Sequence, residues 1–160
     1  MGTYTLDSLT FEVPANWQDQ GMLTFTLPSP DKNVKPNVIL TKERLAQEIS
    51  LKDYFERIKQ AVAKRGIKDF KIEDERQIEV NDVPAMLMIC SWDVSAMKQM
   101  LGQGSEEQLK NIQPGQIVKQ VQVSLIKEGV AVNMTASFPA DQFDIYFRPF
   151  KQFLGTIKIS

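Results

Sequence analysis

Residues 17–28, WQDQGMLTFTLP, contain the stretch on which the fold depends. After a polar opening, the chain alternates strictly between the two sides of a strand. The apolar side is formed by Leu23, Phe25 and Leu27, and the other side by Met22, Thr24 and Thr26. The first side has the character of a core face. The second side carries no charge and little apolar surface, so the question is what it contacts.

Strand-like segments recur along the chain, bounded by Gly, Pro, Asn or Asp. Strands are predicted at 4–6 and 9–13 around an Asp7-Ser8 turn, and further strands at 22–27 and 37–41. Two hairpins follow, one made of 70–80 with 85–92 and one of 116–126 with 130–137. A last short strand is predicted at 156–159.

Two amphipathic helices interrupt these strands. The first follows Ser50, which forms a variant capping box with Asp53, and ends at Gly66. The second starts at Ala140 and carries an aromatic stripe; Pro149 inside it should kink the helix or split it. Each helix needs an apolar sheet face to cover. The sequence therefore predicts an α+β fold: a twisted antiparallel sheet of about six or seven strands, with both main helices packed on one face.

The face of the sheet opposite the helices is predicted to be a binding surface. Alternation places no charged residue on it across four strands, although charges normally protect a sheet that faces water. Methionine adapts to apolar partners, and Gln, Asn, Ser and Thr can satisfy polar groups. The predicted surface comprises Met22, Thr24, Thr26, Met86, Met88, Cys90, Gln120, Gln122, Ser124, Asn133 and Thr135. The alternative is that a third helix, residues 95–115 or a second copy of the chain covers this face.

Length and composition narrow the class of protein. The 160 residues fit one domain, 1–160, with an excursion from the sheet at 95–115. A net charge of -1 without long charge runs argues against nucleic acid as a partner. No stretch approaches the roughly 18 apolar residues of a membrane span, and the first residues do not read as a signal peptide. We expect a cytoplasmic protein that does not insert into a membrane.

The sequence contains no histidine. Histidine is the usual general base of hydrolases and the commonest zinc ligand, so we expect neither an enzyme nor a metal site, and no cofactor. The carboxylates of Glu73, Asp74 and Glu75 would not converge, because neighbours in a strand point to opposite faces. Cys90 is interpreted as a small apolar residue, since nothing in the sequence would lower its pKa.

Residues 11–28, FEVPANWQDQGMLTFTLP, resemble the opening of the DcrB-like, PsbP-related family to which the Eag chaperones of type VI secretion effectors belong. The matching residues are Phe11, Pro14, Trp17, Gln18, Asp19 and Gln20, followed by an alternating strand that ends in Leu-Pro. The order of elements is similar over nearly the whole chain, and WQDQ with its flanks is the specific part. The segment between Trp92 and Gln116 is longer than in compact relatives.

The resemblance implies a homodimer that binds the N-terminal transmembrane helices of a secreted toxin and shields them before export. Such a helix of about 20 apolar residues exposes more apolar surface than a soluble protein tolerates. The uncharged surface would contact it, and glutamate at Met88 or Gln122 is expected to weaken binding without harming the fold. The alternative function is a carrier of a lipid or small molecule. Trp17 is interpreted as an anchor at the core edge, or alternatively as a partner contact.

Overall fold

The computed structural model describes residues 2–17, 21–28, 36–67, 70–93 and 117–158. The predicted excursion at 95–115 lies outside these residues, as does Ile159 of the predicted last strand. The described elements are β1 (Gly2–Leu6), β2 (Leu9–Val13), β3 (Met22–Thr26), β4 (Asn37–Arg44), α1 (Leu51–Lys64), β5 (Lys71–Val80), β6 (Val83–Asp93), β7 (Ile117–Lys127), β8 (Val130–Pro139), a 3₁₀ turn (Ala140–Gln142) and α4 (Phe143–Thr156). They confirm the predicted α+β class.

Six of the strands form one antiparallel sheet in the order β3-β4-β8-β7-β6-β5. Its two tight hairpins turn at Asn81-Asp82 and Glu128-Gly129, where all four residues have positive φ. Paired positive φ values match the twist of the flanking strands, which explains why these turns favour Asn, Asp and Gly. Both predicted hairpins are confirmed.

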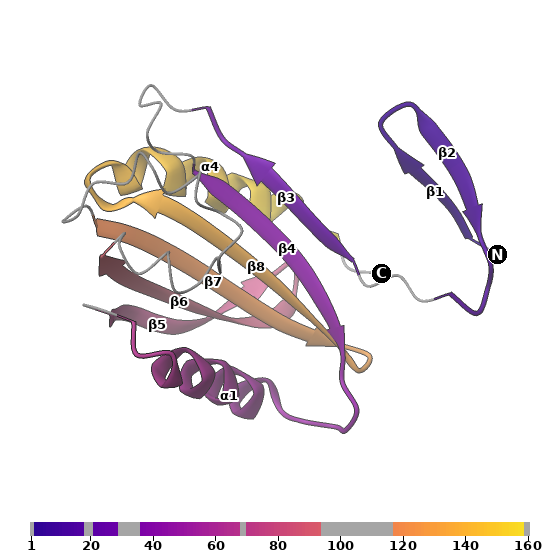
Figure 1. Cartoon of the computed structure of the whole chain (residues 1–160). Helices are drawn as coiled ribbons and strands as arrows, with labels where there is room; N and C mark the ends of the chain where they lie inside the picture. The colour runs from indigo at the N-terminus through magenta and orange to yellow at the C-terminus, as the bar shows by residue number, and fades with distance from the viewer. Residues whose placement is uncertain (1, 18–20, 29–35, 68–69, 94–116, 159–160) are drawn as a thin grey trace.

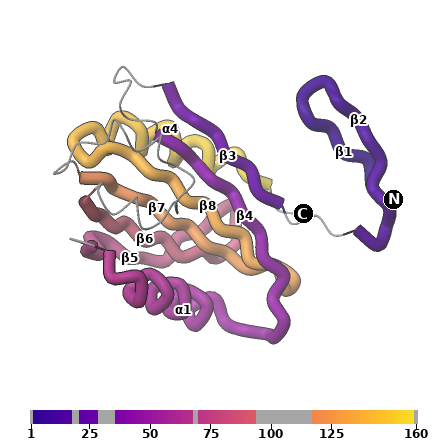
Figure 2. Tube along the Cα trace, viewed as in Figure 1, coloured from indigo at the N-terminus to yellow at the C-terminus, as the bar shows by residue number. Residues whose placement is uncertain are grey.

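Strands β1 and β2 form a separate two-stranded sheet. They turn at Asp7, whose φ is 53°, as the sequence predicted for Asp7-Ser8. Figures 1 and 2 show this hairpin standing clear of the six-stranded sheet. Neither strand of this hairpin therefore belongs to the sheet that contains β3 and β4.

Helices α1 and α4 cover opposite faces of the six-stranded sheet (Figure 1), so the prediction that they share one face is wrong. Helix α4 packs Tyr146, Phe150 and Leu154 on the apolar face that was predicted for it. Helix α1 packs Phe55 on Met88, Cys90 and Trp92. The reason lies in β6, which is apolar on both sides, as strands covered on both faces are. Each face of such a strand needs its own cover.

The helix ends follow the local chemistry of the chain. The Ser50 side chain accepts a hydrogen bond from the Asp53 backbone N–H at 3.1 Å, which confirms the predicted cap of α1. Helix α4 continues through Pro149 without splitting. Pro149 cannot donate to the carbonyl of Ile145 one turn earlier, but Ile145 is 68% exposed, so water can reach that side of the helix. Residues 157–158 are not in a strand.

Candidate functional site

The structure places all eleven predicted surface residues on one face of the six-stranded sheet, the face on which α1 packs. Cross-strand pairing aligns them in rows that run from β3 through β4, β8 and β7 to β6. We call these rows the uncharged face: Met22–Thr41–Asn133–Ser124–Met86, Thr24–Ile39–Thr135–Gln122–Met88 and Thr26–Asn37–Ser137–Gln120–Cys90. The β4 members were missing from the predicted surface, although alternation within 37–41 already marks them.

Accessibility rises steadily across the uncharged face from β6 to β3. On β6 and β7, four predicted residues are buried: Met88, Cys90, Gln122 and Ser124. Met86 and Gln120 are half-buried, as are the members on β4 and all those on β8, Asn133 and Thr135 among them. On β3, Met22, Thr24 and Thr26 are exposed. We call the accessible part, over β3, β4 and β8, the open strip.

Helix α1 accounts for the closed part of the face. Phe55 lies on Met88, which is 1% exposed, and on Cys90. A glutamate at Met88 or Gln122 would therefore be a buried charge without a partner and would destabilise the fold. This differs from the expectation that both substitutions leave the fold intact. In this conformation the four buried residues are not accessible to a partner.

A hydrogen-bonded network links α1 to the uncharged face. The Tyr54 hydroxyl donates to Glu43 Oε2 at 3.1 Å and accepts a bond from Asn133 Nδ2 at 2.9 Å. Asn133 Oδ1 in turn accepts bonds from Ser124 Oγ at 2.6 Å and Gln122 Nε2 at 3.2 Å. Thr135 Oγ1 donates to Gln122 Oε1 at 2.6 Å. These polar side chains satisfy one another beneath the helix, as buried polar groups must.

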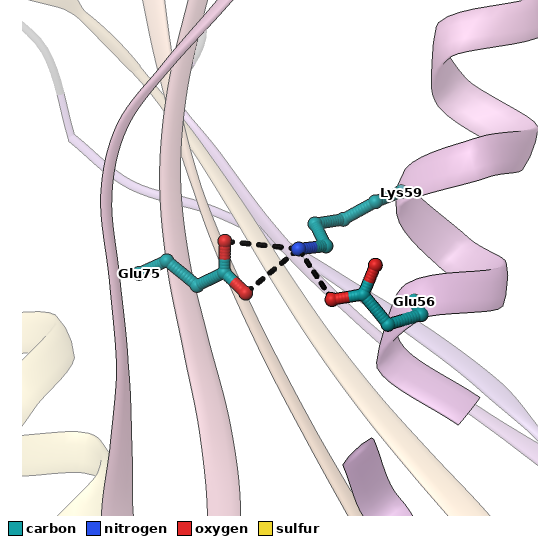
Figure 3. A network of polar contacts seen from close by, with 3 residues as sticks. All are labelled: Glu56, Lys59 and Glu75. Atoms are coloured by element: carbon teal, nitrogen blue, oxygen red, sulfur yellow. Dashed lines mark hydrogen bonds and ion pairs between the residues drawn. The ribbon is translucent and has the colours of Figure 1, made fainter. Parts of the chain in front are cut away.

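An ionic cluster fixes the other side of α1 to strand β5 (Figure 3). Lys59 Nζ lies 2.6 Å from Glu56 Oε1 on the same helix, and 2.8 and 3.1 Å from the carboxylate oxygens of Glu75. Hydrogen bonds to Glu56 and then to Glu75 raise the pKa of Lys59. The helix is thus held by β5 on one side and by β4 and β8 on the other.

Three buried polar atoms of the described residues have no hydrogen-bond partner: Asn37 Oδ1, Ser91 Oγ and Trp92 Nε1. Asn37 belongs to the open strip, but its amide oxygen is itself buried. Burial, with a smaller contribution from Glu73, raises the pKa of Cys90 to about 12. The thiol is therefore protonated at neutral pH and is no activated nucleophile, in agreement with its interpretation as a small apolar residue.

Trp17 does not anchor the core, because its side chain is 67% exposed. Its backbone N–H donates to the Pro14 carbonyl at 3.0 Å and closes a turn after β2. Gln18, Asp19 and Gln20 of the WQDQ motif lie outside the described residues. Among the described residues, no group of three His, Cys, Asp or Glu side chains could hold a metal ion, and no helix could cross a membrane.

Solved structures of other proteins share this fold. PA94 from Pseudomonas aeruginosa, a protein of unknown function, is similar with a TM-score of 0.71 at 18% identity over 100% of this chain and 97% of that one. CyanoP, the PsbP of Synechocystis sp. PCC 6803, is similar with a TM-score of 0.54 at 10% identity over 99% and 92% of the two chains. No curated protein matches the chain. Residues 9–144 match the DcrB family, a range that includes all six strands of the large sheet and helix α1. The chain belongs to the DcrB family, with a PsbP-like fold.

Proposed function

We propose that the protein is a chaperone of type VI secretion effectors that binds the N-terminal transmembrane helices of a toxin and shields them in the cytoplasm before export. The observation that carries this proposal is the open strip. Met22, Thr24 and Thr26 are exposed beside half-buried Ile39 and Thr41, and no charge interrupts the three rows. A surface strand without charge invites association, so such a strip is suited to an apolar partner.

The dimensions of the strip suit one helix. Neighbouring strands lie about 4.8 Å apart, so β3, β4 and β8 present a strip about 10 Å wide before side chains are added. An α-helix with its side chains is about 10–12 Å across. Helix α1, over β6 and β7, borders the strip on one side. One protomer therefore has room for one client helix, and a homodimer, which is part of the proposal, offers two such strips.

The chemistry of the strip also suits a client taken from water before it reaches a membrane. Met22 and Ile39 supply adaptable apolar contacts. The hydroxyls of Thr24, Thr41 and Ser137 can bond small polar groups on the client, as side chains do between helices in lipid. Residues 11–28, which resemble the opening of the family of the Eag chaperones, include β3, and membership of the DcrB family is consistent with that resemblance.

The test is capture of a candidate effector with a hydrophobic N-terminal segment, by co-expression and pull-down. We expect capture of the full effector and none of an effector that lacks its hydrophobic N-terminal segment. Thr24→Glu on the exposed part of the strip should abolish capture. The matched control is Gln77→Glu, on the same face but on β5 at the far edge, which should leave capture unchanged.

Three outcomes would count against the proposal. Capture of the truncated effector would show that the hydrophobic segment is not what is bound. Equal capture by the Thr24→Glu and Gln77→Glu proteins would show that the strip is not the contact surface. A lipid found in the purified protein, with no capture of effector, would favour the alternative of a lipid carrier.

A further inference from the structure

The two helices are attached to the six-stranded sheet unequally. Helix α4 buries Tyr146, Phe150 and Leu154 in the larger apolar cluster. Helix α1 buries only Phe55 in the smaller apolar cluster, with Val62 half-buried beside it. Because burial of apolar side chains is the main attractive contribution to packing, the sheet holds α4 more firmly than α1.

The polar contacts of α1 lie at its two sides, where water can replace them. On one side, the ion pair of Lys59 with Glu75 is at the surface, and such pairs contribute little to stability. On the other side, Tyr54 bonds to Asn133 and to the exposed Glu43. Neither side would leave a charge without water if the helix moved.

The polar side chains beneath α1 keep most of their hydrogen bonds without the helix. The bonds join neighbours within β7 and β8, namely Gln122, Ser124, Asn133 and Thr135. Of this network, the bond from Asn133 to Tyr54 is the one that crosses from the sheet to α1. Displacement of α1 would therefore leave a sheet surface whose polar groups still bond to one another.

The apolar cluster on the α1 side of the sheet contains an unsatisfied donor. Trp92 stacks on Phe70 with ring centroids 6.5 Å apart and belongs to the same cluster as Phe55. Its Nε1 is buried and has no hydrogen-bond partner. A buried donor without a partner costs free energy, so the closed state is less stable than its apolar contacts alone would make it.

Both ends of α1 can act as pivots. Residues 45–50, which precede the helix, are neither helix nor strand, and the Leu45 N–H is fixed to the sheet by a 2.8 Å bond to the Gly129 carbonyl. After the helix, Gly66 has a φ of 61°, which glycine adopts without strain. The helix can therefore swing about its two ends while β4 and β5 stay paired in the sheet.

We propose that α1 is a displaceable cover, which moves off the sheet as a unit while the six strands and α4 stay folded. Elements with few buried apolar contacts open at a lower free energy than global unfolding requires. Opening exposes the part of the uncharged face that α1 closes, namely Met88, Cys90, Gln122 and Ser124.

An open α1 gives the uncharged face its full width. Its five strands, from β3 to β6, span about 19 Å at a spacing of about 4.8 Å, roughly twice the width of the open strip. The place that α1 leaves already fits a helix, so we assign it to a second apolar helix of the same client. This use of the opening rests on the proposed function, whereas the opening itself does not.

Cys90 provides the test, because it is the one cysteine of the chain and lies in the cluster with Phe55. The rate at which a thiol reagent labels Cys90 is measured on the full chain in native buffer at neutral pH. The matched control is Val121→Cys in a Cys90→Ala background, which places the thiol on the α4 face of the same sheet. We expect Cys90 to be labelled at least tenfold faster than the Val121→Cys thiol.

Two further substitutions separate opening of α1 from global unfolding. Tyr54→Phe should raise the labelling rate of Cys90 by about tenfold, because it removes the bond to Asn133. Phe150→Leu, beneath α4, should speed labelling of the Val121→Cys thiol and leave that of Cys90 unchanged. The proposal is overturned if Phe150→Leu speeds both thiols equally, if the two thiols react at equal rates, or if Tyr54→Phe has no effect.

The second seat is tested by locking the cover. Lys59→Cys and Glu75→Cys, in a Cys90→Ala background, are bridged by a bis-maleimide, since the native side chains are 2.8 Å apart. The probe is a soluble carrier protein fused to two apolar helices of about 20 residues joined by a short loop. The bridge should weaken capture of this probe at least tenfold, while a carrier with one such helix is captured equally before and after bridging.

The opening and the chaperone role can fail separately. If the bridge leaves capture of the two-helix probe unchanged, α1 does not vacate a second seat. If neither probe is captured by either form, the proposed function and the second seat are both contradicted, while the opening is judged from Cys90 labelling alone. If both probes are captured but Cys90 is labelled only on global unfolding, the cover is wrong and the open strip suffices for the chaperone role.

Discussion

Asn133 on β8 donates a hydrogen bond of 2.9 Å to the Tyr54 hydroxyl on α1, across 79 residues of sequence. The same hydroxyl donates to Glu43 on β4 at 3.1 Å. One phenol oxygen therefore links the helix to two strands of the open strip. Burial raises the pKa of Tyr54, and the carboxylate of Glu43 adds to the shift, so the hydroxyl is a donor at neutral pH.

Removing this hydroxyl should weaken the attachment of α1. Tyr54→Phe leaves the ring in place but deprives Asn133 Nδ2 of its acceptor, and we expect the free energy of unfolding to fall by about 1–3 kcal/mol. The control is Tyr146→Phe, because the Tyr146 hydroxyl makes only a 3.4 Å contact with Gln142 within its own chain segment. Urea unfolding measures both. Equal losses in the two proteins would contradict a special role for the Tyr54 hydroxyl.

The ionic cluster at Lys59 should contribute less than this polar network. Its partner Glu56 is half exposed, so Lys59→Met is expected to cost within about 1 kcal/mol at low salt and less at high salt. Because the pKa of Lys59 is raised, this contribution is complete below the ordinary value of 10.5 and is lost as pH rises through the raised value. The control is Lys52→Met on the exposed side of α1. If Lys59→Met lowers the free energy of unfolding by the same amount at low and at high salt, an ionic contribution is contradicted.

Ionisation of Cys90 is expected to make the free energy of unfolding depend on pH in the alkaline range. Its pKa is about 12 in the folded chain and has an ordinary value of 9.0, so the unfolded chain releases the proton first. Below pH 9.0, the ordinary pKa of the thiol, Cys90 adds no pH dependence to stability. Above that pH, the free energy of unfolding falls by about 1.4 kcal/mol per pH unit until the thiol of the folded chain also ionises. Unfolding curves of the wild-type chain and Cys90→Ala should therefore converge or cross only above pH about 9. Parallel curves throughout would show that Cys90 does not titrate in this way.

Much of the fold follows from local pattern. The alternation in 22–27, the cap at Ser50 and the turn at Glu128-Gly129 are determined by neighbouring residues, and the structure confirms each of them. Alternation also assigned the face of every predicted surface residue correctly, because a strand has a strict period of two. The sheet order depends on pairing between distant segments, which periodicity does not reveal.

The position of α1 is where sequence reasoning failed, and the reason is physical. Both helices are amphipathic, so pattern alone allows either to cover either face. The signal that was available is β6, where Met86, Met88, Cys90 and Trp92 provide a second apolar side. Met86, Met88 and Cys90 were interpreted as part of a surface for a partner, whereas Phe55 of the same chain occupies much of it. Burial of a strand on both faces requires two layers, one on each side.

The unequal edges of the sheet limit how far copies of this chain can assemble. If copies of this chain joined through β3, each outer end would be a β5 strand, where carboxylates, basic side chains and a bulge oppose the addition of another strand. Such an assembly would stop after a single step and would not lead to fibrils.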